Sequence, residues 1–197
     1  MIRSKNISLS LGKVTILQDL TFTIEKGDNV CFAGPSGTGK SSVLKMLQGY
    51  MLPDAGFIEV NGMELNVSNI KHIRSLMSYI PQNINLPVND GAELLKLLHA
   101  GERKDQVNHF IEELGIPADM LSHQFEEMSG GEKQRIVIAI CLSLEREIIL
   151  LDEPTSSLDH GSVKKLINVI QALDNKTIVA ASHNSDWMNF AGKTIML

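Results

Sequence analysis

The sequence contains little cysteine. Only Cys31 and Cys141 occur in 197 residues, each inside an apolar run, and the two do not show the spacing of a metal site. Disulfide-stabilised secreted domains and cysteine zinc sites need more cysteines than this. We therefore interpret the two thiols as small core side chains of a protein in a reducing cytosol.

The sequence also lacks an excess of basic residues. Its 18 Lys and Arg residues stand against 23 Asp and Glu residues, which gives a formal net charge of -5 at pH 7. A mildly acidic chain has no general attraction for nucleic acid or for anionic lipid. Any phosphate-bearing ligand must therefore be held by local geometry.

Long hydrophobic runs are absent as well. The first residues, MIRSKNISLS, lack the apolar segment of a signal peptide, and no apolar run is long enough to span a membrane. With 43% hydrophobic and 21% charged residues, the composition is that of an ordinary soluble protein of one domain. If the protein works at a membrane, we expect another chain to span it.

What the sequence does contain is an alternation of strand and helix patterns. Residues 6–11 and 15–24 predict two half-exposed strands joined by a turn at Gly12 and Lys13, and Asn61–Gly62 predicts a second hairpin. Further strands are predicted at residues 28–34, 75–82, 147–154 and 176–183, with helices after the first of these and at 130–147 and 163–173. This order predicts an α/β fold with a mainly parallel sheet and an antiparallel element at the N-terminus.

The segment from residue 83 to residue 128 has a different character. It contains two helical patterns, at residues 90–101 and 104–115, and no strand pattern. We expect it to form a helical subdomain inserted into a core of residues 1–82 and 129–197, the whole chain being a single domain.

A glycine-rich segment, GPSGTGKSS, follows a predicted strand and precedes a helix. Its glycines allow backbone N–H groups to surround an anion, and the helix adds its positive N-terminal end. The lysine can contact the β- and γ-phosphates of a nucleotide, and the first serine after it can bind Mg²⁺. The nucleotide-binding residues predicted here are Gly34, Pro35, Ser36, Gly37, Thr38, Gly39, Lys40, Ser41 and Ser42. This motif alone would also suit a small nucleotide kinase.

Two adjacent carboxylates end a predicted buried strand. In the segment EIILLDEP, Asp152 and Glu153 follow four apolar residues, and neighbouring side chains of a strand project in different directions. We assign Asp152 to the metal side and Glu153 to an attacking water. Because a glutamate of ordinary pKa is a weak base, we expect Glu153 mainly to orient the water and to stabilise charge.

A second anion-binding pattern, MSGGEKQR, occurs far from the first. Ser129 can cap a helix and donate to a phosphate, while Gly130 and Gly131 let backbone N–H groups approach closely. Ser129 and Glu132 also have the spacing of a capping box. Both interpretations can hold together.

Five segments, GPSGTGKSS, YIPQ, MSGGEKQR, EIILLDEPTSSLD and AASH, occur in the order found in the ATP-binding subunits of ABC transporters. The resemblance covers essentially the whole chain, and five ordered motifs are highly specific. It implies a P-loop NTPase core, ATP and Mg²⁺. By the same resemblance, Gln82 looks like the residue that contacts Mg²⁺ and the water, and His183 like the residue that contacts the γ-phosphate.

The resemblance also implies partners. Two subunits of such ATPases meet head-to-tail, so that Ser129, Gly130 and Gly131 of one close over the ATP of the other, and Asp159 resembles the residue that links the halves. We expect a homodimer or a heterodimer with a second ATPase subunit, together with a separately encoded transmembrane permease. The protein would then be cytoplasmic, bound to the inner face of the cell membrane through that partner.

The sequence departs from the family at one position. Members usually carry an aromatic residue, on which adenine stacks, where this chain has Leu11. An aliphatic contact is expected to grip the base less well, since aromatic stacking contributes about 1–3 kcal/mol per base. We still expect a preference for ATP over GTP, but Leu11 provides no aromatic ring to support it.

Two other functions fit the sequence less well. Soluble ABC-type ATPases that act on DNA or ribosomes generally have long coiled-coil insertions or two ATPase copies, whereas only residues 83–128 separate Gln82 from Ser129 here. The acidic charge also gives no indication of nucleic-acid binding. In a nucleotide kinase, residues 129–131 and the Ser182–His183 pair that ends the last predicted strand would have no role. The transporter subunit is therefore the favoured interpretation.

Overall fold

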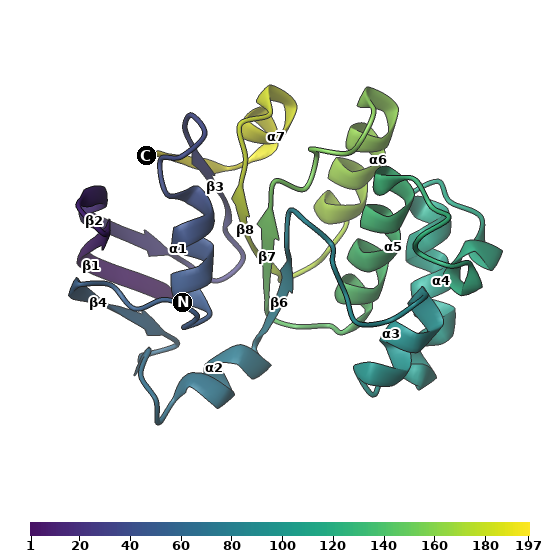
Figure 1. The fold of residues 1–197 in the computed structure, drawn as a ribbon, viewed down its shortest axis with the longest axis horizontal. Helices are drawn as coiled ribbons and strands as arrows, with labels where there is room; N and C mark the ends of the chain where they lie inside the picture. The colour runs from purple at the N-terminus through teal and green to yellow at the C-terminus, as the bar shows by residue number, and fades with distance from the viewer.

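The computed structural model describes residues 1–197 and contains two sheets (Figure 1). The first sheet is antiparallel. Its turns are those predicted: Gly12 and Lys13 join a pair that ends at Leu11 and Val14, and Asn61 and Gly62 both have positive φ angles, of 51° and 76°. In spatial order its strands are β2 (Val14–Ile24), β1 (Ile2–Leu11), β4 (Ala55–Val60) and β5 (Met63–Glu64).

The second sheet is parallel throughout, as predicted for the core of the chain. The strands that the sequence identified as buried runs lie at its centre. They are apolar along their length because both faces of the sheet are covered by other elements. In spatial order its strands are β6 (Met77–Ile80), β7 (Ile148–Asp152), β8 (Thr177–Ala181), β3 (Asn29–Ala33) and β9 (Lys193–Met196).

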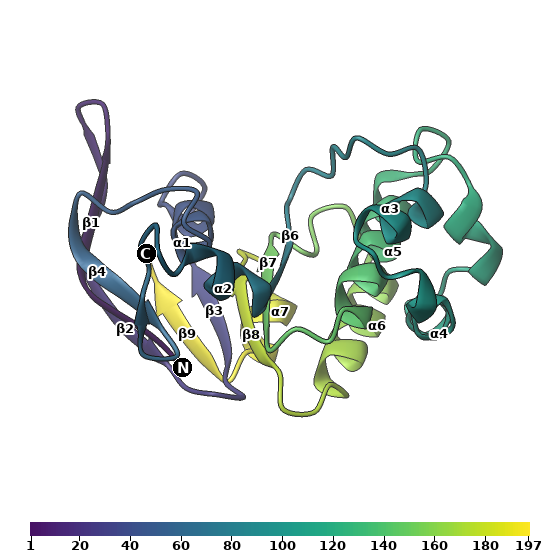
Figure 2. The ribbon, with the colours of Figure 1, turned by 90° about the horizontal axis from the view of Figure 1, so that it is seen from below.

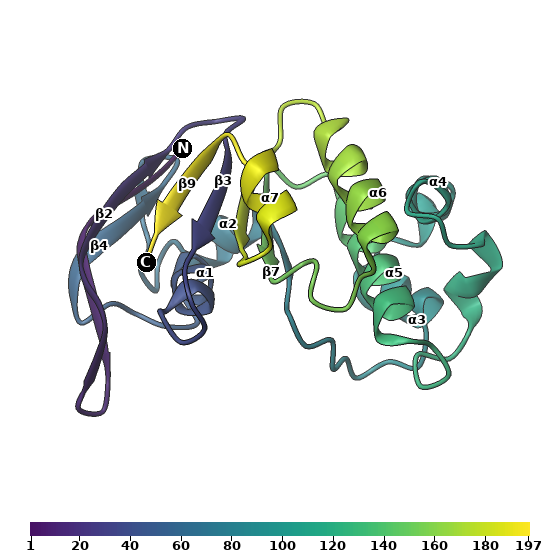
Figure 3. The same ribbon diagram turned by 90° about the horizontal axis from the view of Figure 1, so that it is seen from above.

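The parallel sheet separates two apolar cores. Along β3, Val30 and Phe32 face the core shared with helix α1 (Lys40–Leu47) and the antiparallel sheet, whereas Cys31 and Ala33 face the other core. Figures 2 and 3 show α1 between the two sheets. Both cysteines are buried and unpaired, as predicted.

The second core lies under the remaining long helices. Helix α5 (Gly130–Ser143) is buried on nearly every side, and α6 (His160–Gln171) packs beside it. Within residues 83–128 the helices are α3 (Gly91–Leu97) and α4 (Lys104–Glu113), with short 3₁₀ turns at Gly101–Arg103 and Ala118–Ser122. Because α3 and α4 pack on α5, one apolar cluster continues across residue 128. The division into core and helical subdomain stays a prediction.

Three short elements were missed in the sequence. They are α2 (Ile70–Ser75), α7 (Ser185–Phe190) and β9. Each helix has one fully buried residue, Ile73 or Trp187, so neither shows an apolar stripe. Strand β9 is a mostly exposed edge strand. None of the helices combines the length and the apolar character needed to cross a bilayer.

Candidate nucleotide site

The glycine-rich loop lies between the end of β3 and the start of α1. Gly39 has a φ of 96°, and a Cβ atom there would lie only 2.7 Å from Ile16 Cγ2. Only glycine combines that backbone conformation with so close an approach. The loop is therefore packed directly beneath the β1–β2 hairpin, whose tip extends beyond the other strands (Figure 2).

The loop opens on a cavity of about 430 Å³. Most predicted site residues meet there, although they come from distant parts of the sequence. Residues at the ends of β6, β7 and β8 join the loop because these strands are parallel neighbours whose carboxyl ends share one edge. The lining residues are Leu11, Ile16, Ser36, Gly37, Gly39, Lys40, Ser41, Ser42, Gln82, Glu153 and His183.

Lys40 is the cation of this cavity, and its side chain is only 6% exposed. Its Nζ donates to the carbonyl oxygens of Gly34 and Pro35, at 2.8 and 3.0 Å, and lies 3.7 Å from Glu153 Oε1. Two carbonyl dipoles are weaker partners than a phosphate dianion. The ammonium group is thus held within the loop, where a phosphate would be its better partner.

Asp152, the last residue of β7, is held by two hydroxyl groups. Ser41 Oγ donates to its Oδ1 at 2.7 Å, and Tyr79 Oη donates to its Oδ2 at 3.1 Å. Burial, followed by the Asp152 charge, raises the pKa of Tyr79, so its hydroxyl remains a proton donor. Tyr79 was missed in the sequence, because its place two residues before Pro81 gives no sign that its hydroxyl reaches Asp152.

The donor set at this end of the cavity suits a hard cation. The Asp152 carboxylate, the Ser41 hydroxyl and the amide oxygen of Gln82, which lines the same cavity as Ser41, can all serve as the oxygen ligands that Mg²⁺ prefers. Nowhere does the chain gather three His, Cys, Asp or Glu side chains that could hold a metal by themselves. A cation here would need further oxygens from a nucleotide, as Mg²⁺ in phosphoryl-transfer sites usually does.

Glu153 turns sharply out of the strand, with a φ of 47° and its N–H bonded to the carbonyl oxygen of Ala181. Because of this turn, and not only because side chains alternate along a strand, the side chains of Glu153 and Asp152 point in different directions. Its side chain is 8% exposed, Oε1 lies 2.9 Å from Nδ1 of the largely exposed His183, and the buried Oε2 has no hydrogen-bond partner in the chain. A buried carboxylate oxygen of this kind is suited to accept a hydrogen bond from a water.

The second anion-binding pattern, at residues 129–131, does not line this cavity. Ser129 and Glu132 form the expected capping box at the start of α5: Ser129 Oγ accepts from the Glu132 N–H, and Glu132 Oε2 accepts from the Ser129 N–H and hydroxyl. These bonds lower the pKa of Glu132. A Cβ atom on Gly131 would lie 2.6 Å from the Ser157 carbonyl oxygen, so the backbone approaches closely there.

Ser129 and Gly130 are exposed to solvent, and neither they nor Gly131 line the phosphate cavity. Gly130 lines a separate hollow of about 240 Å³ with Gln82. Asp159 is exposed as well, and it caps α6 by accepting from the Ser162 N–H at 2.9 Å. The start of α5 thus faces outward, away from the phosphate cavity of its own chain.

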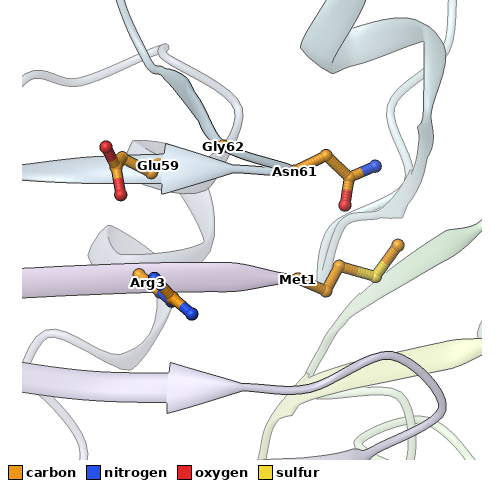
Figure 4. Close-up of a pocket in the computed structure, with 5 residues that line it drawn as sticks. All are labelled: Met1, Arg3, Glu59, Asn61 and Gly62. Atoms are coloured by element: carbon orange, nitrogen blue, oxygen red, sulfur yellow. The ribbon is translucent and has the colours of Figure 1, made fainter.

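A further hollow lies on the antiparallel sheet. It has a volume of about 250 Å³ and lies at the start of β1, the end opposite Leu11 (Figure 4). Arg3 and Glu59, from neighbouring strands, stand opposite each other and balance in charge. No glycine loop or helix start opens into it, so we assign it no ligand. It is lined by Met1, Arg3, Glu59, Asn61 and Gly62.

Comparison with known proteins identifies the family. The family model described as ABC transporter matches residues 17–156, which include the glycine-rich loop, Gln82, Ser129 and the carboxylate pair. Leu11, Asp159 and His183 lie outside the match. Most of the cavity lining therefore falls within the region that the family model describes.

Similar proteins agree with this match. The energy-coupling factor transporter ATP-binding protein EcfA1 of Mycoplasmopsis pulmonis is 34% identical over 94% of this chain and 75% of that protein. The ABC transporter ATP-binding protein YtrE of Bacillus subtilis is 31% identical over 91% and 86%. Each is aligned with the chain over most of its length.

Two solved structures of one bacterial ABC transporter cassette, MJ0796, have the same fold. The dimeric cassette aligns with a TM-score of 0.90 at 26% identity, and its dimeric post-hydrolysis state with ADP and Pi aligns with 0.89 at 25% identity. Both alignments cover 100% of this chain and 94% of the other. The chain therefore belongs to the ABC transporter family, as an ATP-binding and ATP-hydrolysing cassette.

Proposed function

We propose that two cassettes close head-to-tail on two Mg-ATP molecules, each bound by the loop of one subunit and covered by residues 129–131 of the other. The observation that carries this proposal is the exposed cradle at the start of α5, which lies outside the phosphate cavity of its own chain. Because residues 129–131 do not line the loop cavity of their own chain, a second chain would bring the two helix starts to one nucleotide. The partner is another copy or a related ATPase.

We propose the following roles within each site. The loop N–H groups and Lys40 bind the phosphates, while Ser41, Asp152 and Gln82 hold Mg²⁺. The ion, when bound, supplies neutralisation of the phosphate charge. Glu153 aligns the attacking water through its free Oε2, and His183 steadies the Glu153 carboxylate and contacts the γ-phosphate.

A test of nucleotide binding uses Lys40→Ala. Removing a buried ammonium group that faces phosphates should weaken Mg-ATP binding by about 100-fold, since such charge pairs contribute roughly 2–5 kcal/mol. Isothermal titration calorimetry measures the change. The control is Lys45→Ala, an exposed lysine of the same helix that does not line the cavity. Equal affinity of both variants and the wild type would contradict the assignment.

Tyr79→Phe tests whether the tyrosine hydroxyl positions Asp152. The variant should need about 10-fold more Mg²⁺ to reach half of its maximal ATP affinity. Loss of a hydrogen bond to a metal-binding side chain typically weakens metal binding by 10- to 100-fold. ATP affinity is measured across a Mg²⁺ titration, with the exposed Tyr50→Phe as control. A fall in thermal stability with an unchanged Mg²⁺ midpoint would reduce Tyr79 to a packing role.

We also propose that a separately encoded transmembrane permease docks on the helical subdomain, residues 83–128, and holds the cassette at the cytoplasmic face of the membrane. Ile84, Leu86 and Val88 are half-buried against the core, whereas Leu97 on α3 is 56% exposed and available to a partner. Leu97→Glu should abolish co-purification with a membrane protein from detergent extracts, while Phe57→Glu on the antiparallel sheet should not. Retention of the partner by Leu97→Glu would contradict this docking surface.

A further inference from the structure

We propose that Gln134, on helix α5, is a positioning residue that holds Glu153 in its catalytic orientation and ties it to the start of that helix. The proposal rests on the role in hydrolysis proposed above for Glu153. Gln134 does not line the phosphate cavity, so within its own chain it acts on the nucleotide through another residue. The residue that it contacts is Glu153 itself.

The Gln134 side chain is buried, and only half of its amide is used. The residue is 1% exposed, its Nε2 donates to the carbonyl oxygen of Glu153 at 3.4 Å, and its buried Oε1 has no hydrogen-bond partner in the chain. An unpaired buried polar atom destabilises a folded protein, and an apolar side chain of the same shape would avoid that cost. What a glutamine provides here, and an apolar side chain would not, is the bond to Glu153.

Glu153 needs support because of its backbone conformation. Its φ of 47° lies in the left-handed region, which a non-glycine residue keeps only when its surroundings hold it there. Its N–H donates to the carbonyl oxygen of Ala181, and its own carbonyl oxygen accepts from the Ser156 N–H and from Gln134 Nε2. Of these three bonds, only the last comes from α5. Without it, the turn can relax and carry the carboxylate away from the water that it aligns.

The same helix begins with the exposed residues that would cover the nucleotide of a partner subunit. Gly130 and Gln134 are four residues apart, hence on one face of α5, and both line the hollow of about 240 Å³. A Cβ atom on Gly131 would lie 2.6 Å from the carbonyl oxygen of Ser157. The segment 153–157 therefore meets the beginning of α5 at both of its ends. One turn of helix thus joins the surface that would contact the partner's nucleotide to the carboxylate that acts on the chain's own.

Gln134→Met tests this role, because methionine keeps the length of the side chain and cannot donate the hydrogen bond. We expect kcat to fall about 10-fold, since a small displacement of a reacting group is costly to the rate. The affinity of the dilute monomer for Mg-ATP should be unchanged. Thermal stability should be unchanged as well, because the substitution removes a buried amide that is only half satisfied. Phosphate release, calorimetry and thermal denaturation measure the three quantities.

The matched control is Gln48→Met. Gln48 is also buried, and its Nε2 also donates to a backbone carbonyl oxygen, that of Leu44, at 3.0 Å. It lies at the C-terminal end of α1 and does not bond to Glu153. This variant should hydrolyse ATP at the wild-type rate, whatever it loses in stability.

A double variant distinguishes positioning from a general structural role. In a Glu153→Gln background the carboxylate is already absent, so adding Gln134→Met should cause no further loss of the residual hydrolysis. The double variant should still form a dimer in saturating Mg-ATP, because residues 129–131 are intact. Gln134→Asn, whose amide is one methylene too short to reach the Glu153 carbonyl, should reproduce the loss of kcat.

The outcomes separate this inference from the proposed function. A wild-type kcat in Gln134→Met, or in Gln134→Asn should the first variant fail to fold, would overturn the inference while the role of Glu153 stands. So would a further 10-fold loss in the double variant, or a loss of ATP affinity as large as the loss of kcat. If Glu153→Gln itself keeps hydrolysing ATP, the proposed function is wrong. A loss confined to kcat, absent from Gln48→Met and from the Glu153→Gln background, supports the inference.

Discussion

The Glu153→Gln variant is expected to lose ATP hydrolysis by at least about 100-fold while it still binds Mg-ATP. Glutamine keeps the volume and one carbonyl oxygen of the buried side chain, but it lacks the carboxylate charge that orients the water, and such groups typically contribute 10²- to 10⁴-fold to the rate. Because the γ-phosphate is not removed, the sandwich should persist. Gel filtration in saturating Mg-ATP should then show a dimer, and a phosphate-release assay should show almost no turnover.

The matched control for this variant is Glu147→Gln, which changes an exposed glutamate at the other end of β7. It should hydrolyse ATP at the wild-type rate and should not accumulate as a dimer. A Glu153→Gln protein that turns over ATP at a comparable rate would remove Glu153 from the mechanism. One that remains monomeric in saturating Mg-ATP would contradict the sandwich.

Ser129→Asp separates the capping role of this residue from its proposed phosphate contact. Aspartate can cap a helix as serine does and suits the positive helix end, but here it would lie beside the Glu132 carboxylate that accepts from the Ser129 hydroxyl, so a modest loss of thermal stability is expected. Its carboxylate would, however, face the γ-phosphate bound by the partner subunit. Like charges so placed cost several kcal/mol, so dimerisation and hydrolysis should fall by about 100-fold or more.

ATP binding by the dilute monomer should be unaffected in Ser129→Asp, since Ser129 does not line the cavity of its own chain. Ser129→Asn is the control: asparagine also caps the helix, carries no charge, and can donate to a phosphate. It should keep most of the hydrolysis. Full activity of Ser129→Asp would leave the residue with a capping role only.

Much of the antiparallel sheet could be predicted from local chemistry. Gly12 and the Asn61–Gly62 pair mark hairpin turns because the backbone needs positive φ angles there, and the structure has those angles. The buried parallel strands were also predictable, since β7 and β8 are continuous apolar runs. These signals lie within a few residues of the feature that they predict.

The missed elements depend on distant contacts. Helix α7 is held by the Asn184 cap and by the single fully buried side chain of Trp187, neither of which forms a periodic pattern. Strand β9 exists because it pairs with β3, and a mostly exposed run of four residues does not reveal that partner. Such elements follow from the tertiary fold and have no strong local preference.

In the nucleotide site, too, some features could be predicted from local sequence and others depend on distant contacts. The residue types in the glycine-rich loop and at Asp152 and Glu153 indicate phosphate chemistry by their spacing alone. The Tyr79–Asp152 hydrogen bond, the positive φ of Glu153 and the contact of Lys40 with the loop carbonyls follow from three-dimensional packing. The exposed position of Ser129 also requires the fold, although its capping box was predicted.

The central claim is that each nucleotide is enclosed by two chains, and the dependence of turnover on protein concentration tests it most directly. With saturating Mg-ATP, phosphate release per chain should rise in proportion to concentration at high dilution and reach a plateau when the subunits associate. A rate per chain that stays constant over a 100-fold dilution, down to concentrations at which sedimentation shows only monomer, would contradict the account.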